Sequence, residues 1–381
     1  MRVLFASTRG AGHFYPLVPL IDACAARGDE VLVVAPPALE PVLAARKQPY
    51  RIGGEPPPEA IADVRARAMG LGPDDGVFLM VSEGFGRLGT AAMLPATEEA
   101  CRDWRPDLVL HETFEFSSVV AAERHGIPHA RVAVSAGRFT AVTDPLVGPV
   151  LDAYGSGIAG RLLASPYLTR LPASMDPSPY DVTHRYHEEA RPGALPDWWG
   201  GAKEPLVHLT LGSEAGALPT AAGLYRGLLE AVGALPVRVL LTTGHHLDPA
   251  DFGPQPPHVR VESWVPQEDV LREASVVVCH GGSGTVYGAL AAGVPLVCVP
   301  LFADQPENAR LVAGTGAGAS VTPTGGRGGE SVMLSADDVR GIGAAVERIL
   351  TEPSFRERAG KLAEEVRNTP SADGVLGVLG G

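Results

Sequence analysis

The chain has 381 residues, of which 45% are hydrophobic and 20% charged, and a formal net charge of −13. This length exceeds one ordinary domain core and indicates two domains in a soluble globular protein. The negative net charge, without a stripe of Lys and Arg residues, argues against a nucleic-acid partner. No apolar run approaches the ~18 residues that a membrane span needs.

The four cysteines lie in apolar stretches and show no CxxC spacing. We therefore expect reduced core thiols in a cytoplasmic protein, since the N-terminal apolar run is also too short for a signal peptide. The sequence does not fix the oligomeric state and leaves a homodimer open. The cysteines are Cys24, Cys101, Cys279 and Cys298.

The first element expected is a buried strand at Val3 to Ala6, followed by a polar loop and a helix that begins near His13. A second strand is expected at Glu30 to Ala35. His13 then stands at the carboxyl edge of the sheet, where open α/β sheets bind ligands. An imidazole there suits a general base, because its ordinary pKa lies near neutral pH. A capping or packing histidine is the alternative.

Another buried strand is expected at Asp107 to Leu110, with acidic residues just beyond it. A carboxylate at this strand end can accept the Nδ1–H of His13, which fixes the tautomer and raises the basicity of the ring. Glu112 is the first candidate and Glu115 the second, because His111 leaves the end of the strand uncertain. The alternative is a carboxylate that only interacts favourably with the dipole at the start of the next helix.

The stretch from Pro36 to Pro95 carries many prolines and glycines, with weak helical patterns at 60–69 and 77–88. It indicates long excursions over the sheet edge, and Gly137 to Pro149 indicates a further loop. Apolar side chains in these excursions either line a pocket or fill small cores beneath the loops.

The segment Tyr180 to Glu204 is rich in Pro, Gly and Trp and is the expected interdomain linker. A strand at Leu206 to Leu211 and a turn at Gly212 and Ser213 then repeat the pattern that opens the chain. Ser213 either contacts a ligand or only caps the turn. Further strands are expected at Val237 to Thr243 and His258 to Ser263.

A βαβ unit is expected between Trp264 and Asn308. A buried strand at Val276 to Cys279 runs into the glycine-rich turn His280 to Thr285, and a helix then stops at Gly293 before the strand Pro295 to Pro300. Glycines allow close approach of the backbone, and the N–H groups at a helix start favour a phosphate. A turn that is glycine-rich only because it is tight is the alternative.

Two polar residues, Asp304 and Gln305, follow the last of these strands and should reach the same edge of the sheet. A carboxylate beside a carboxamide suits sugar hydroxyls. Upstream, the ring of Trp264 can form a wall for a nucleobase. A turn suited to bind phosphate, a pair of side chains suited to bind hydroxyls and an aromatic ring suited to contact a nucleobase together indicate a nucleotide sugar.

These pieces resemble the signature of the family of UDP- or TDP-sugar-dependent glycosyltransferases with the GT-B fold, including the antibiotic glycosyltransferases of actinomycetes. They are Trp264 to Gln267, His280 to Thr285 and Asp304 to Asn308. The early stretch TRGAGHFYPLVPL resembles the N-terminal motif of the same family, in which the histidine is the general base.

The resemblance implies an α/β fold with two facing Rossmann-like domains and a deep cleft between them. Residues 1–195 would bind the acceptor and residues 196–353 the nucleotide sugar. Residues 354–381 would form a C-terminal helix that crosses back to the first domain. Within this segment, we expect the final residues, Thr369 to Gly381, to be frayed.

The resemblance also implies roles for single residues, with His13 as the base and Glu112 as its partner. The implied donor-binding residues are Gly12, Ser213, Trp264, Val265, His280, Gly282, Ser283, Gly284, Thr285, Asp304 and Gln305. The acceptor-binding candidates are Phe78, Met80, Phe85 and Phe114.

The function implied is inverting transfer of a sugar from a TDP- or UDP-sugar to a hydroxyl of a small natural product. No cofactor is expected besides this co-substrate. No metal is expected, because the chain lacks an Asp-x-Asp triplet and the adjacent His245 and His246 have no third ligand. A nucleotide-sugar epimerase of the same fold and a non-catalytic sugar-nucleotide-binding helper are the alternatives.

Overall fold

The computed structural model describes residues 1–190, 193–325 and 332–379. The chain divides into two compact units. Unit 1 comprises Met1–Leu171, Asp176–Glu188 and Thr369–Gly381, and unit 2 comprises Pro172–Met175 and Glu189–Asn368. The main boundary therefore follows residue 188, whereas we expected it after residue 195. The chain returns to unit 1 at residue 369, whereas we expected the return at residue 354.

Among its described residues, unit 1 contains a seven-stranded sheet in which every recorded pairing is parallel. The strand order is β3-β2-β1-β4-β5-β6-β7, the order of a doubly wound α/β fold. The strands are β1 (Arg2–Ala6), β2 (Glu30–Ala35), β3 (Tyr50–Ile52), β4 (Leu108–Glu112), β5 (His129–Val132), β6 (Tyr167–Thr169) and β7 (Thr183–Arg185).

The central strands β1 and β4 are buried on both faces, which explains why they read as largely apolar runs. Side chains alternate between the two faces of a strand. From β1, Val3 and Phe5 therefore enter one apolar cluster with Leu20, whereas Leu4 enters another with Val120. The helices on the two faces complete these two clusters.

The helices of unit 1 cover the sheet and extend its edge. They are α1 (Ala11–Phe14), α2 (Val18–Arg27), α3 (Glu40–Ala45), α4 (Pro58–Met69), α5 (Pro73–Leu79), the π-helix η3 (Met80–Gly89), α6 (Thr90–Trp104), α7 (Ser117–His125), α8 (Gly137–Asp152), α9 (Ile158–Ala164) and α16 (Ala372–Leu379). Short 3₁₀ turns lie at η1 (Tyr15–Leu17) and η2 (Pro37–Leu39).

One continuous helical stretch of the described chain, Asp74–Trp104, is long and apolar enough to cross a membrane by length and composition alone. It comprises most of α5, all of η3 and α6. In unit 1 its residues Met93, Leu94 and Cys101 are buried in a core cluster that also contains residues of α7. Core helices of globular domains pass the same test, so the stretch is weak grounds for a membrane span.

Unit 2 repeats the topology of unit 1. Its described residues form a six-stranded parallel sheet in the order β10-β9-β8-β11-β12-β13. The strands are β8 (Leu206–Thr210), β9 (Arg238–Thr242), β10 (Val259–Glu262), β11 (Ala274–Cys279), β12 (Leu296–Cys298) and β13 (Gly318–Ser320). The two halves are therefore both Rossmann-like, as the repeated strand-and-turn pattern predicted.

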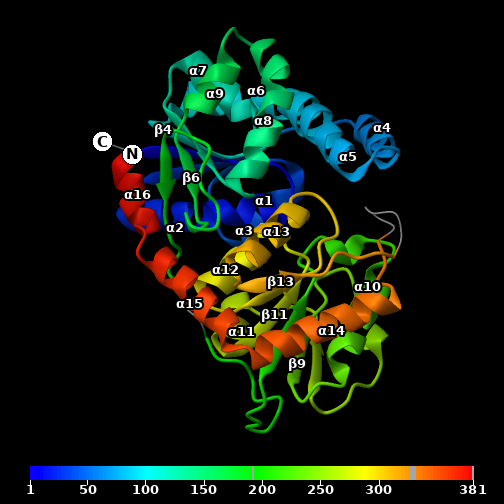
Figure 1. Cartoon of the computed structure of the whole chain (residues 1–381). Coiled ribbons are helices and arrows are strands. Elements are labelled where there is room, and N and C mark those ends of the chain that lie inside the picture. The colour runs from blue at the N-terminus through cyan, green and yellow to red at the C-terminus, as the bar shows by residue number, and fades with distance from the viewer. Residues whose placement is uncertain (191–192, 326–331, 380–381) are drawn as a thin grey trace. The chain divides into compact units, whose positions relative to one another are not determined.

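The helices of unit 2 include the predicted βαβ unit, in which β11 leads through the glycine turn into α12. In Figure 1, α15 lies beside α12, in agreement with their packing. The elements are α10 (Ala221–Gly233), α11 (Gln267–Glu273), α12 (Ser283–Ala291), α13 (Gln305–Thr315), α14 (Ala336–Thr351) and α15 (Pro353–Arg367), with 3₁₀ turns η4 (Ala215–Ala217) and η5 (Pro249–Phe252).

Two expectations about loops and ends were wrong. Gly137 to Pro149 forms most of helix α8, although Pro145 and Pro149 lie inside it. Burial of Val147 and Leu151 in the core stabilises this helix against the missing backbone bonds. The chain end, expected to be frayed after Thr369, forms α16, which packs on α2 in unit 1 (Figure 1).

Candidate active site

In unit 1 the structure brings His13 and Glu112 together at the point where the strand order reverses. His13 follows β1 on the short helix α1, and Glu112 is the last residue of the neighbouring strand β4. Nδ1 of His13 lies 3.1 Å from Oε1 of Glu112. The His13 side chain is 24% exposed, and Glu112 is fully buried. Ligands of open α/β sheets bind at such a reversal.

The Glu112 carboxylate is held by further donors. Oε1 accepts the hydroxyl of Thr8 at 2.6 Å and its N–H at 3.2 Å, and Oε2 accepts the N–H of Phe114 at 2.7 Å. Burial alone would raise the pKa of Glu112, but attraction to His13 and these hydrogen bonds outweigh it, and the pKa is lowered. Glu112 is thereby kept ionised beside His13.

The second carboxylate candidate, Glu115, has a different role. Its two oxygens accept the N–H and hydroxyl groups of Ser117 and Ser118, so Glu115 caps the start of α7. Burial raises the pKa of Glu115. His111, which left the strand end uncertain, lies within β4, paired in register with Ala6 of β1. The strand thus extends two residues beyond the predicted end and stops at Glu112.

Of the four acceptor-binding candidates, two contact His13. Phe85 from η3 and Phe114, just after β4, have ring centroids 5.4 Å and 5.9 Å from that of His13. Phe78 and Met80 are half-buried on α5 and at the start of η3, in the same run of helices.

In unit 2 the ring of His280 lies between two glycine turns. His280 follows β11, and its neighbour strand β8 leads into Gly212 and Ser213. A Cβ atom added to Gly282 would lie 2.3 Å from Nε2 of His280, and one added to Gly212 would lie 2.6 Å from Cε1. Desolvation of this ring lowers the pKa of His280 to about 4, so the imidazole is neutral at neutral pH.

The helix α12 starts directly after this turn, with Gly282 as its N-cap. The first N–H groups of an α-helix have no partner within the helix, and its dipole adds positive charge there. Ser283 is half-buried, Gly284 is exposed and Thr285 is 8% exposed. This end of α12 is therefore suited to hold an anion such as a phosphate.

A polar network fixes the turn to the start of α13. The Ser283 hydroxyl donates to Oδ2 of Asp304 at 2.8 Å. Nδ2 of Asn308 donates to the carbonyl of Gly281 at 2.9 Å and to Oδ2 of Asp304 at 2.9 Å. Asn308 is only 1% exposed. The network holds Gly281 at φ +83°, a left-handed conformation that favours glycine.

The remaining donor-binding candidates lie in different surroundings. Trp264, after β10, is 60% exposed, and Val265 is half-buried in a small apolar cluster of unit 2. Gln305 is 4% exposed, and its Oε1 accepts the N–H groups of Leu301 and Phe302 at 2.9 Å and 3.0 Å. That oxygen is therefore already hydrogen-bonded to the protein backbone. Ser213 is exposed in the turn after β8, and Gly12 is exposed on the short helix α1 that follows β1.

Thr8 and Asn308 belong to the site, although sequence reasoning did not single them out. Thr8 lies in the polar loop after β1, and Asn308 ends the motif that begins at Asp304. Their positions just beyond strand ends were visible in the sequence. Their partners, Glu112 and Gly281, are distant in the chain or are backbone groups, and only the fold brings them together.

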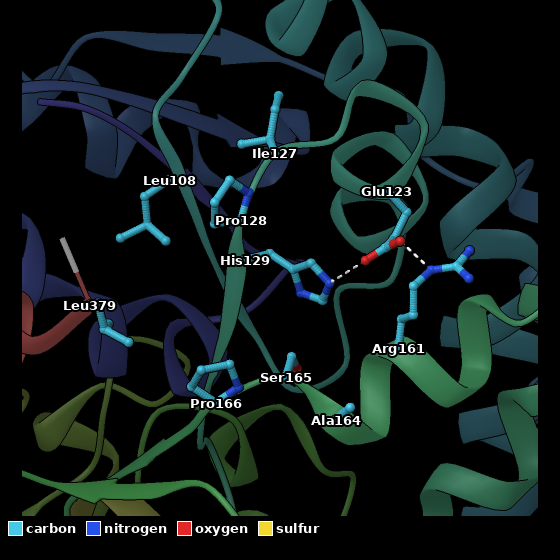
Figure 2. Close-up of a pocket in the computed structure, with 10 residues that line it drawn as sticks. All are labelled: Leu108, Glu123, Ile127, Pro128, His129, Arg161, Ala164, Ser165, Pro166 and Leu379. Carbon is cyan, nitrogen blue, oxygen red and sulfur yellow. Dashed lines mark hydrogen bonds and ion pairs between the residues drawn. The ribbon is translucent and has the colours of Figure 1, made fainter. Parts of the chain in front are cut away.

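A pocket of about 310 Å³ lies at the opposite edge of the unit 1 sheet (Figure 2). Its lining includes Leu108 and His129, which begin β4 and β5, so it is separate from the His13 site. Nε2 of His129 lies 3.2 Å from Glu123, which also pairs with Arg161. Burial lowers the pKa of His129, with Glu123 opposing the change. Across the described residues, no cluster of three or more His, Cys, Asp or Glu is placed to hold a metal ion.

Comparison with known proteins identifies the family. Residues 69–212 and 226–379 match the N-terminal and C-terminal domains described as erythromycin biosynthesis protein CIII-like. The elloramycin glycosyltransferase ElmGT of Streptomyces olivaceus is 32% identical, over 97% of this chain and 94% of its own length. The L-demethylnoviosyl transferase of Streptomyces niveus is 32% identical, over 97% and 95%.

The fold is shared with a solved structure, the glycosyltransferase SsfS6 of Streptomyces sp. SF2575 complexed with thymidine diphosphate. It superposes with a TM-score of 0.75 at 24% identity and covers 100% of this chain and 99% of its own. The chain therefore belongs to the EryCIII-like family of GT-B glycosyltransferases from actinomycete antibiotic pathways.

Proposed function

We propose that this glycosyltransferase moves a sugar from a TDP-sugar, or from a UDP-sugar, to a hydroxyl of a small natural product with inversion at the anomeric carbon. The observation that carries the proposal is the pair formed by His13 and the ionised, buried Glu112 at the reversal of the unit 1 sheet. It is the arrangement expected for a general base and its orienting group.

In the proposed reaction, His13 donates its Nδ1–H to Glu112, which leaves the lone pair of Nε2 for the acceptor. Nε2 takes the hydroxyl proton while the acceptor oxygen attacks the anomeric carbon. The bond from that carbon to the diphosphate breaks on the opposite face, and the electron pair leaves with the diphosphate. Glu112 stabilises the positive charge that forms on His13.

The donor diphosphate is proposed to bind at the start of α12, where the first backbone N–H groups have no partner within the helix. His280 adds a neutral N–H donor, consistent with its lowered pKa. The thymidine diphosphate bound to SsfS6 supports TDP as the nucleotide. Charge growing on the leaving group would be stabilised by these groups, and we therefore propose that no metal is needed.

The test is release of nucleoside diphosphate from TDP- and UDP-sugars in the presence of a panel of small hydroxylated natural products. We expect release that requires an acceptor and that falls about 10²–10⁴-fold in His13→Ala, with donor binding retained by calorimetry. Activity should persist in excess EDTA. Release without any acceptor would point to the epimerase alternative, and full activity in His13→Ala would remove His13 as the base.

We also propose that the enzyme works in the cytoplasm. All four cysteines are free and buried, which fits a reducing compartment. Fractionation of cells that produce the protein tests this, because recovery with the membrane pellet would contradict it.

A further inference from the structure

Three phenylalanines form a continuous group of rings beside the proposed base. Phe85 lies 5.4 Å from His13 and 5.6 Å from Phe114, and Phe114 lies 6.3 Å from Phe139, all between ring centroids. We call Phe85, Phe114 and Phe139 the aromatic cluster. All three residues belong to unit 1, so the cluster is complete within that unit.

The cluster is assembled from three separate elements. Phe114 follows β4, Phe139 lies on α8, and Phe85 lies on the π-helix η3. π-helical turns are uncommon and occur frequently at functional sites. Here η3 packs closely on α8, since a Cβ atom added to Gly86 would lie 2.9 Å from Cγ1 of Val147. From these two packed helices, Phe85 and Phe139 both reach the ring of Phe114.

The rings differ in how much surface they leave uncovered. Phe114 is 6% exposed and forms the base of the cluster, whereas Phe85 and Phe139 are half-buried. The carboxylate nearest to His13, Glu112, is fully buried and already hydrogen-bonded. Phe85 therefore leaves part of its ring accessible next to His13.

We infer that the acceptor is a flat aromatic compound and that its reacting hydroxyl is a phenol. This inference rests on the proposed function. Aromatic rings favour offset or edge-to-face contacts at centroid distances of about 4.5–7 Å, and Phe85 and Phe139 offer partners for such contacts beside the base. A saturated or macrocyclic acceptor would gain only apolar burial from the same surface.

The chemistry at His13 is consistent with a phenol. A phenol loses its proton near pH 10, as tyrosine does, so its transfer to an imidazole is less uphill than transfer from an aliphatic alcohol. The O–H bond of the phenol breaks, its proton goes to Nε2 of His13, and the phenol oxygen forms the bond to the anomeric carbon. The bond to the diphosphate breaks, and the diphosphate leaves with the electron pair.

The test compares 2-naphthol with its saturated counterpart, decahydro-2-naphthol, by calorimetric binding in the presence of TDP. We expect 2-naphthol to bind at least tenfold more tightly. Phe85→Leu and Phe139→Leu should each weaken 2-naphthol binding by about two- to tenfold and leave decahydro-2-naphthol unchanged, because leucine keeps apolar volume and removes the ring. Phe85→Tyr should retain binding.

The matched control is Phe252→Leu, at a half-buried ring of unit 2 whose centroid lies 6.1 Å from that of Tyr225. It should bind 2-naphthol as the wild type does, and circular dichroism verifies the fold of every variant. Equal affinity for the two compounds, no binding of 2-naphthol, or unchanged binding in both leucine variants overturns the inference.

Transfer assays with TDP-sugars separate this inference from the proposed function. Selective binding of 2-naphthol without any glycoside product from any acceptor would remove the transferase proposal and leave the aromatic site. If glycosides form equally well on both compounds, and the leucine variants lose no transfer activity, the transferase proposal stands and the inference of a phenolic acceptor is wrong.

Discussion

The hydroxyl of Thr8 donates to Oε1 of Glu112 at 2.6 Å, and this is the oxygen that lies 3.1 Å from Nδ1 of His13. The backbone N–H of Thr8 bonds to the same atom at 3.2 Å. The loop after β1 therefore positions the carboxylate that positions the proposed base. Thr8 itself acts through Glu112.

The substitution Thr8→Val should lower kcat and leave the donor KM unchanged. It removes one hydrogen bond to a buried charged group, worth about 1.5–3 kcal/mol, so we expect roughly a tenfold or greater loss in the reaction step. Steady-state kinetics at varied TDP-sugar concentrations measures kcat and the donor KM separately. Thr8→Ser keeps the hydroxyl and should retain most activity. A rise in donor KM with constant kcat would assign Thr8 to donor binding instead.

The substitution Gly282→Ala should weaken nucleotide binding. The new Cβ atom would lie 2.3 Å from Nε2 of His280, so the ring must leave its place between the two turns. Loss of the hydrogen bond proposed between His280 and the diphosphate would cost about 1–3 kcal/mol, or roughly 5- to 150-fold in Kd for TDP by calorimetry.

Gly314→Ala is the matched control for this change. Gly314 lies on α13, and an added Cβ atom there meets nothing within 4 Å. It should bind TDP as the wild type does. Wild-type affinity in Gly282→Ala would show that the position of His280 does not matter for the nucleotide.

The stability of unit 2 should fall as the pH drops from about 6.5 to 4. Burial lowers the pKa of His208 on β8 from 6.5 to about 4, so the unfolded chain binds a proton in this window before the folded chain does. Stability contributed by the neutral ring is complete above pH 6.5 and is lost toward pH 4. A shift of this size corresponds to about 3 kcal/mol.

Urea denaturation at several pH values, followed by tryptophan fluorescence, measures this loss. His208→Asn should be less stable at pH 7, because it disturbs the bond to Thr242, but its stability should change less between pH 6.5 and 4. His245→Asn, at an exposed position, should keep the wild-type slope. An unchanged slope in His208→Asn would contradict the assignment.

The sequence predicted those parts of the fold and site that depend on local patterns. The turn from β11 into α12 has a continuous apolar run, glycines and a helix start within a few residues, and each has a direct physical meaning. Likewise, β2 lies where the sequence placed it, at Glu30–Ala35. Glu112 was the first choice as partner of His13, and the two side chains lie together in the structure.

Features that depend on tertiary packing were not predictable in this way. The prolines of α8 indicate a loop, and only its burial against η3 and the core explains a helix there. Gln305 follows a strand end as a sugar-binding residue would, yet its oxygen is bonded to the backbone of Leu301 and Phe302. The π-helix that brings Phe85 to His13 has no sequence pattern that we can identify.

Helix α16 should contribute substantially to the stability of unit 1, although the sequence indicated a frayed end. Leu376 is fully buried in the cluster that contains Leu20 and Cys24 of α2. Leu376→Ala should lower the free energy of unfolding by about 2–5 kcal/mol, because it removes buried methyl groups and leaves a cavity. Scanning calorimetry should show a lower Tm. Val378→Ala, at a residue that is 62% exposed on the same helix, should leave the Tm nearly unchanged. Equal effects of the two substitutions would mean that α16 does not pack on α2 in solution.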